Sequence, residues 1–289
     1  TYNRNDLLPR AIKSVLAQSR DDFEIIVVDN ANDPLVKDVV AGFSDDRINL
    51  IQDSTRRGAA VARNIGVAHA RSDLIAFLDD DDEYRCNFIE EVSKAFSDYN
   101  IDFLWCGTIQ LFPHDSDNGY DEKEKFVKDV PSRPMEFVLR IGTGCGFCIK
   151  KKAFDAVGGF DEMFKVSEDR DLVLSLLEAG FDFIHLDKLL YRRYYHNEQR
   201  LSDSTASLEE AKCAERLLSK HKNYLANYKL LRLKILDLVA KKYYQGGDLN
   251  SALATAYFAW KQSPFRVKGL RRLLRYAVKK HTSRMLASH

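Results

Sequence analysis

Hydrophobic positions along the first two hundred residues alternate between helical spacing and short continuous runs. Residues 6–18 place Leu8, Ile12, Val15 and Leu16 on one face of a helix, and residues 23–30 form an apolar run that predicts a buried strand. The pattern then predicts helices at 35–43, from about 58 and at 87–99, and strands at 48–53, 74–78 and 101–112. Strands and helices in this order are typical of an α/β protein.

The pattern changes twice toward the C-terminus. Residues 113–134 are rich in charge, Gly and Pro, which predicts an irregular excursion, and a glycine-rich stretch follows at 141–151. A helix is predicted at 169–179 and a strand at 181–187. From residue 208 the spacing is helical, and the runs on either side of QGGDLN (245–250) predict a helical hairpin. We therefore expect an α/β domain at 1–204 and a basic helical region at 205–289.

The composition fits a globular chain whose two parts carry opposite charge. The 289 residues are 45% apolar, no run approaches the roughly 18 apolar residues of a membrane helix, and no secretory leader is visible, so we expect a cytoplasmic protein. Residues 205–289 hold 18 Lys and Arg against 5 Asp and Glu, and residues 1–204 hold 26 against 38. The balances of +13 and −12 predict an anionic partner for the basic region, such as the inner face of the cell membrane.

The five cysteines indicate reduced thiols, because their number is odd and a chain of this size does not need disulfides. Cys145 and Cys148 form one C-x-x-C pair. A zinc site would need a second pair of ligands at the usual spacing, and the sequence has none. We expect no metal or redox role for this pair.

Carboxylates follow two of the predicted strands, at Asp29 and at residues 79–82. In open α/β sheets the ligand crevice lies beyond the carboxyl ends of the strands, so both acidic ends are expected at one crevice. Neighbouring carboxylates raise one another's pKa unless a cation compensates them, and Mg²⁺ and Mn²⁺ prefer oxygen ligands. A solvated acidic turn is the alternative interpretation.

Six short segments together resemble the family 2 glycosyltransferases of the GT-A fold, most of which are bacterial enzymes of polysaccharide assembly. They are TYNR (1–4), VVDNAND (27–33), RRGAAVARNIGVAHA (56–70), FLDDDDEY (77–84), GGFDE (158–162) and SEDRDL (167–172). The resemblance implies a Rossmann-like GT-A domain, and the helical spacing after residue 208 adds an all-helical appendage to it. It also implies an inverting enzyme that moves a sugar from a nucleotide sugar, usually a UDP-sugar, to a glycan or lipid-linked acceptor.

The resemblance assigns the nucleotide and metal sites residue by residue. Asp81 would bind Mn²⁺ or Mg²⁺, with Asp79 and Asp80 toward the metal's water shell and the ribose. Tyr2 would stack on the base beside Asp29 and Asn30, where Asn30 replaces the Asp of many relatives, which leaves the identity of the base open. Arg57 and Arg63 would frame the nucleotide, although Arg63 could equally form a salt bridge with the acidic turn.

The same resemblance assigns catalysis to SEDRDL. Asp169 would take the proton of the acceptor hydroxyl, with Glu168 in reserve, although both acids could simply cap a helix. His196 would reach the metal or the diphosphate, and Arg192 and Arg193 would lie in the same anionic region. Residues 142–146 would bring glycine backbone beside the donor sugar.

Three features depart from the family or lie outside it. Relatives carry an apolar strand directly before TYNR, so we expect residues before Thr1 in the working protein. The Q-x-x-R-W motif of processive members is absent near Gln199, which favours a non-processive enzyme. Residues 265–284 suit either an interfacial helix or a helix packed on the protein with its cations in solvent.

A second function class stays open at this point. The chain could be a non-catalytic scaffold of the same fold, whose helical region recruits a partner enzyme or a membrane. Intact acids at Asp81 and Asp169 argue against it. We expect no nucleic-acid partner.

Overall fold

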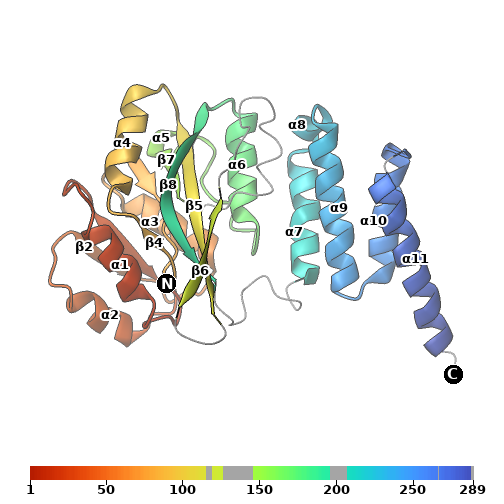
Figure 1. Ribbon diagram of the computed structural model, residues 1–289, viewed down its shortest axis with the longest axis horizontal. Helices are drawn as coiled ribbons and strands as arrows, with labels where there is room; N and C mark the ends of the chain where they lie inside the picture. Colours follow the sequence, from red (N-terminus) through yellow and green to blue (C-terminus); the bar gives the residue numbers. More distant parts are fainter. Residues whose placement is uncertain (115–118, 126–145, 196–206, 266, 288–289) are drawn as a thin grey trace. The chain divides into compact units, whose positions relative to one another are not determined.

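The structure is a computed structural model, and it describes residues 1–114, 119–125, 146–195, 207–265 and 267–287 (Figure 1). The chain divides into two compact units. The first comprises Thr1–Met163 and Glu168–Asn197, and the second comprises Phe164–Ser167 and Glu198–His289. Among the described residues, no helix is long and apolar enough to cross a membrane.

The first unit begins with a small α/β layer. A two-stranded parallel sheet pairs β1 with β2 in the register Ile25 opposite Ile48. The apolar positions that predicted these elements form one core around Leu8, Ile12, Val27 and Val36. The elements are α1 (Leu8–Leu16), β1 (Ile25–Asp29), α2 (Pro34–Ala41), β2 (Ile48–Gln52) and α3 (Ala59–His69).

A six-stranded mixed sheet forms the centre of this unit (Figure 1). Its order is β3–β7–β5–β8–β4, and β6 also pairs with β5. Strand β5 is buried from Phe103 to Leu111, and its parallel pairing with β8 carries an irregularity around Gly107. The strands are β3 (Leu74–Ala76), β4 (Glu83–Tyr84), β5 (Phe103–Pro113), β6 (Tyr120–Lys125), β7 (Phe147–Lys150) and β8 (Phe183–Tyr194), with helices α4 (Phe88–Asp98), α5 (Lys151–Ala156) and α6 (Glu168–Glu178).

Three sequence expectations about this sheet were wrong. Residues 120–125 form the strand β6 instead of part of an irregular excursion, because they pair antiparallel with the second half of β5. The charged sequence YDEKEK lacks the apolar alternation that predicts a strand. Charged side chains are nevertheless common on exposed strands, where they prevent pairing with other chains. The strand expected at 74–78 ends at Ala76, and the strand expected at 181–187 continues to Tyr194.

The second unit is helical, as expected. It consists of α7 (Ser207–Lys220), α8 (Lys222–Ala226), α9 (Lys229–Gln245), α10 (Leu249–Gln262) and α11 (Val267–Ala287). Helices α9 and α10 form the hairpin predicted around QGGDLN. Gly247 has a φ of +85°, which favours glycine, and the Asp248 carboxylate caps α10 by accepting the Ser251 N–H at 3.0 Å.

Candidate active site

Residues 79–82 form a tight acidic turn between β3 and β4. The N–H of Asp82 donates to the carbonyl of Asp79 at 3.1 Å, which closes the turn. The chain enters through Phe77, which is buried, and the Tyr84 hydroxyl donates to the Phe77 carbonyl at 2.8 Å. Buried aromatic residues on both sides therefore hold the turn in place.

Two arginines contact three of the four acids of the turn. One Arg4 nitrogen, Nη1, donates to Asp80 Oδ1 and to Asp81 Oδ2, both at 3.1 Å. Arg63 Nη2 donates to Asp79 Oδ1 at 2.9 Å. Because Arg4 lies in TYNR and Arg63 lies in α3, three of the six sequence motifs meet at this turn.

Asp82 is the most deeply buried of the four acids. Its carboxylate accepts the Tyr191 hydroxyl at 2.7 Å and the Tyr194 N–H at 2.8 Å, both from β8. These donors favour the ionised form, but burial and then the charges of Asp79 and Asp81 outweigh them and raise the pKa of Asp82 to about 8. The protonated form of Asp82 is therefore favoured by its burial and by the two neighbouring acids.

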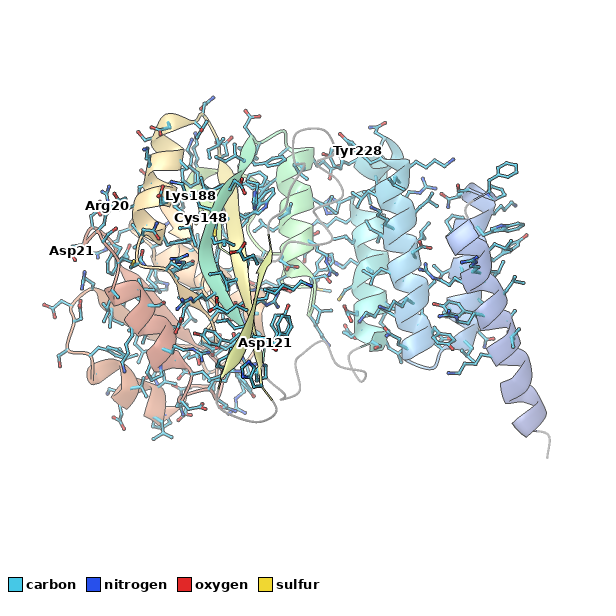
Figure 2. The ribbon with its side chains drawn as sticks, in the orientation of Figure 1. Arg20, Asp21, Asp121, Cys148, Lys188 and Tyr228 are labelled. Carbon is cyan, nitrogen blue, oxygen red and sulfur yellow. The ribbon has the colours of Figure 1, made fainter. Side chains whose placement is uncertain are left out.

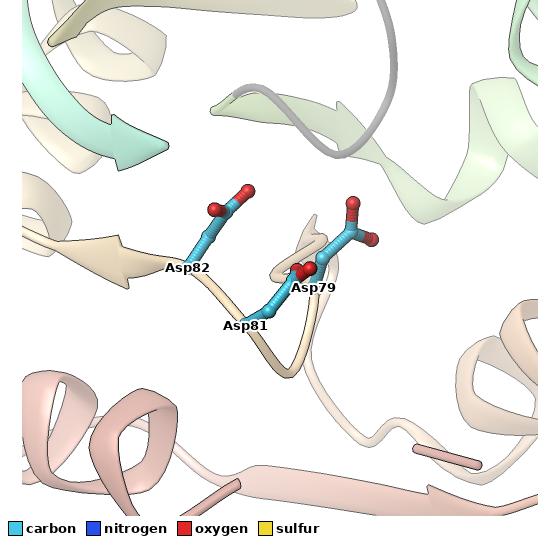
Figure 3. Close-up of side chains that lie close together, drawn as sticks. All are labelled: Asp79, Asp81 and Asp82. Carbon is cyan, nitrogen blue, oxygen red and sulfur yellow. The ribbon is translucent and has the colours of Figure 1, made fainter. Parts of the chain in front are cut away.

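Three of the acids form a cluster with the donor set of a divalent cation. Asp79, Asp81 and Asp82 each offer a carboxylate oxygen, and the three atoms lie within 4.8 Å of one another. Figure 3 shows these side chains close together on one turn. Carboxylate oxygens suit Mg²⁺ and Mn²⁺, and a cation would relieve the repulsion that raises the Asp82 pKa. The residues therefore fit the metal that the sequence predicted.

Arg63 connects the acidic turn to the start of α6. Its Nη1 donates to Glu168 Oε1 at 2.7 Å while its Nη2 contacts Asp79. The guanidinium therefore forms the salt bridge that was one of two sequence interpretations, and both of these nitrogens are used in it. The neighbouring Asn64 side chain exchanges two hydrogen bonds with the backbone of Phe160, each at 2.9 Å. Helix α3 thus fixes the acidic turn, GGFDE and the first residue of α6.

Glu168 and Asp169 occupy different environments at that helix start. The Glu168 side chain is 14% exposed, and burial, followed by the charge of Asp169, raises its pKa despite the Arg63 guanidinium. The Asp169 carboxylate is partly exposed and accepts the N–H of Arg170 at 2.7 Å. Negative side chains here also favour the first turn of a helix, so a capping role and a catalytic role are compatible.

The end of β1 is a network of internal hydrogen bonds. Asp29 is fully buried and accepts the N–H groups of Ala31 and Asp33, at 3.0 and 2.7 Å. The Asn30 amide, in the orientation that satisfies both of its ends, donates to Asp53 Oδ2 and accepts the Gly58 N–H, each at 3.2 Å. Asp29 and Asn30 therefore shape the loops at this strand end, and their predicted contacts with a nucleotide stay predictions.

The other predicted nucleotide residues are more open. Tyr2 is 48% exposed. Arg57 is also exposed, and it contacts Thr55 at 3.0 Å and Glu162 at 3.4 Å. Among the described residues, none of its hydrogen bonds is to the acidic turn. His196 and residues 142–145 lie outside the described residues. Gly146 is described, and a Cβ there would lie 2.3 Å from the sulfur of Cys106.

Three arginines, from α1 and β8, complete the surroundings of the turn. Arg10 donates to the carbonyl of Asp81 and stacks over the Tyr194 ring, 3.7 Å from its centre. Arg192 lies 3.8 Å from Glu83, and Arg193 stacks over Tyr195 at 5.5 Å. Both predicted cations of β8 thus lie on the strand that also binds Asp82.

Sequence reasoning missed Asp82, Arg4 and Arg10. The resemblance gave roles to Asp79, Asp80 and Asp81 and none to Asp82, yet residues i and i+3 of a tight turn lie close together, and that rule would have grouped Asp82 with Asp79. No sequence pattern identified Arg4 or Arg10 as partners of residues more than 70 positions away. Cys148 of the C-x-x-C pair is buried in β7, and burial raises the pKa of its thiol, whereas Cys145 lies outside the described residues.

Comparison with known proteins identifies the family that the sequence motifs resemble. The family model described as glycosyl transferase family 2 matches residues 1–158, which is more than half of the chain. The Escherichia coli protein UDP-Glc:alpha-D-GlcNAc-diphosphoundecaprenol beta-1,3-glucosyltransferase WfgD is 30% identical over 178 residues. These residues make up 62% of this chain and 67% of WfgD.

Solved structures are similar over nearly the whole chain. The crystal structure of S. aureus TarS 1–349 in complex with UDP-GlcNAc covers 96% of this chain and 77% of its own, with a TM-score of 0.65 and 14% identity. The mannosyltransferase PcManGT from Pyrobaculum calidifontis, in complex with GDP-Man and Mn²⁺, covers 96% of this chain and 84% of its own, with a TM-score of 0.57 and 18% identity. These likenesses confirm the expected fold class, including its helical C-terminal region.

Proposed function

The chain belongs to glycosyl transferase family 2 and is a glycosyltransferase, and from this premise we propose that it transfers a sugar from a UDP-sugar to a hydroxyl group of a glycan or lipid-linked saccharide. The name of the E. coli relative, which gives a UDP-glucose donor and a diphosphoundecaprenol-linked acceptor, supports both substrate classes. The missing Q-x-x-R-W motif supports non-processive transfer of one sugar per encounter.

One observation carries the proposal. The cluster of Asp79, Asp81 and Asp82 is joined through Arg63 to Glu168, the residue before Asp169. An acidic cluster suited to a metal-bound diphosphate and a carboxylate suited to proton transfer therefore belong to one connected site. A solvated acidic turn would need neither the buried Arg63 bridge nor the two donors from β8 to Asp82.

A divalent cation is the cofactor in this proposal. Asp79, Asp81 and Asp82 would hold Mn²⁺ or Mg²⁺, which acts as a Lewis acid on the negative charge of the departing nucleoside diphosphate. In this proposal His196 would also contact the metal or the diphosphate. Arg4 pairs with both Asp80 and Asp81 from the side of TYNR, so it compensates part of their charge in the metal-free site.

Asp169 is the proposed general base of an inverting, single displacement. It would accept the proton of the acceptor hydroxyl as that oxygen attacks the anomeric carbon of the donor sugar. Asp169 suits this role better than Glu168, because the Glu168 carboxylate is held by Arg63 and is less readily ionised. Arg63 is then a positioning residue that keeps the base-bearing helix at a fixed place relative to the acidic turn.

The nucleotide would lie between the C-terminal end of β1 and the start of α3. Tyr2 offers an exposed ring for the base, and Asp29 and Asn30 shape the loop beside it. Arg57 is exposed, and its weak contact with Glu162 leaves it available to a phosphate. Asn30 replaces the Asp of many relatives, and its amide oxygen can still accept the N–H of a uracil base.

The test is release of nucleoside diphosphate from a panel of UDP-, GDP- and dTDP-sugars, with Mn²⁺ or with a chelator. We expect turnover with a UDP-sugar that is lost with the chelator and in Asp81→Asn, while Asp169→Asn loses turnover and keeps nucleotide binding. Asp98→Asn, at an exposed position at the end of α4, is the matched control and should retain full turnover. Unchanged turnover in both Asp81→Asn and Asp169→Asn would refute the proposed mechanism.

A further inference from the structure

Helix α11 is anchored to its own unit through one face. Tyr276 is 3% exposed and stacks on Tyr244, with 4.3 Å between ring centres and 15° between ring planes. Arg272 forms an ion pair with Asp237 of α9. Both anchoring residues lie on neighbouring positions of the helix surface, because they are four residues apart. This face is an ordinary intramolecular contact.

A second, apolar face of α11 is exposed. Leu270, Leu274 and Val278 are spaced four residues apart and are 40%, 57% and 62% exposed. At about 100° per residue these three side chains span about 80° of the helix surface, and Tyr276 lies about 160° from Leu274. The stripe therefore points away from the anchoring face. Figure 1 shows α11 as the last helix of the helical unit, beside α10.

Two exposed arginines lie along one side of this apolar stripe. Arg271 and Arg275 follow Leu270 and Leu274 directly in sequence, and both are exposed. After Asp248 the chain has no acidic residue, whereas it has nine Lys and Arg. Phe265, two residues before the helix, is 98% exposed, and aromatic rings are enriched where proteins meet the headgroups of a bilayer.

We propose that this outer face of α11, defined by Leu270, Arg271, Leu274, Arg275 and Val278, docks on an anionic lipid bilayer. An amphipathic helix lies in the bilayer interface with its apolar side chains among the acyl chains and its cations at the headgroups, which is the arrangement of this face. A second copy of the chain fits less well, because it would bring the same arginines against one another. Helix α11 thus packs on its own unit through one face and meets the bilayer through the opposite face.

The docking surface is independent of the proposed reaction, so it can be tested without a substrate. The full chain is floated with vesicles of phosphatidylcholine, with and without phosphatidylglycerol, at low and high salt. We expect flotation only with phosphatidylglycerol, weakened by salt. Arg271→Gln with Arg275→Gln should weaken binding roughly 25-fold, at about fivefold per cation near an anionic surface. Leu274→Gln with Val278→Gln should also abolish flotation, at either salt concentration.

Matched controls separate this face from general attraction of a basic protein. Lys222→Gln with Lys241→Gln removes two exposed cations from α8 and α9, and Leu230→Gln changes an exposed leucine of α9. Both controls should float like the parent chain, and circular dichroism of all variants should match it. Equal loss in the controls, or no flotation of the parent chain, would overturn the proposal. So would a parent dimer that Leu274→Gln with Val278→Gln converts to monomer, because the occupant would then be a second copy.

Discussion

Replacing Arg63 by Gln should destabilise the first unit more than any exposed ion-pair change. The guanidinium contacts Glu168 at 2.7 Å and Asp79 at 2.9 Å, and the side chains of Arg63 and Glu168 are only 19% and 14% exposed. Removal of one partner from such a buried pair costs about 3–5 kcal/mol, because the remaining charge stays buried and unpaired. Asp79 is 36% exposed and partly screened by solvent, so we expect the lower end, about 3 kcal/mol.

The assay is urea unfolding of the metal-free protein, followed by tryptophan fluorescence and circular dichroism. Arg57→Gln is the control, since Arg57 contacts Glu162 at 3.4 Å and both side chains are about half exposed. That variant should lose less than about 1 kcal/mol. Arg63→Gln combined with Glu168→Gln should recover part of the loss, because the double variant no longer buries the Glu168 charge.

The effect of Arg63→Gln should also depend on pH. Arg63 favours the ionised form of Glu168, whose pKa burial has already raised, so removal of Arg63 raises that pKa further. A raised carboxyl pKa makes the folded state bind a proton that the unfolded state has lost, so stability falls as pH rises toward that pKa. The difference in unfolding free energy between the parent and Arg63→Gln should therefore become smaller as pH falls below the pKa of Glu168. If Arg63→Gln loses no more unfolding free energy than Arg57→Gln at every pH, the proposed bridge from Arg63 to Asp79 and Glu168 is refuted.

Three further outcomes follow from the site. In metal-free protein, Asp82→Asn should remove a decline in stability between about pH 4 and pH 8, since the folded pKa of Asp82 is about 8, and calorimetry across this range checks it. The same variant should lose most of the rise in melting temperature that Mn²⁺ gives the parent chain, and an unaltered rise would exclude Asp82 from the metal site. Gly159→Ala should melt well below Gly158→Ala, because both have positive φ but only the first places a Cβ 2.8 Å from the Phe154 ring. Similar melting temperatures for the two would show that this contact relaxes.

Much of the fold could be predicted because hydrophobic periodicity reports which side of a local segment is buried. That information identified α1, β1, β5 and the α9–α10 hairpin, and the six motifs identified the family. The segments that failed are those whose burial is decided by a distant partner. The charged pattern of residues 120–125 predicts an exposed, irregular segment, and these residues form a strand because they pair with β5.

The chemistry of the site divides in the same way. The sequence by itself determined that four acids follow a strand and that two acids begin a helix, because these are neighbours along the chain. Only the tertiary structure decided which acid meets which partner: Arg63 reaches Glu168 across 105 residues, and Tyr191 reaches Asp82 across 109. Likewise, the pattern of α11 predicted an amphipathic helix, and packing decided which of its faces Tyr276 anchors and which remains in solvent. A local sequence pattern determines on which side of its helix or strand a residue lies. The energy of an ion pair or hydrogen bond depends on its partner, and folding decides which distant residue becomes that partner.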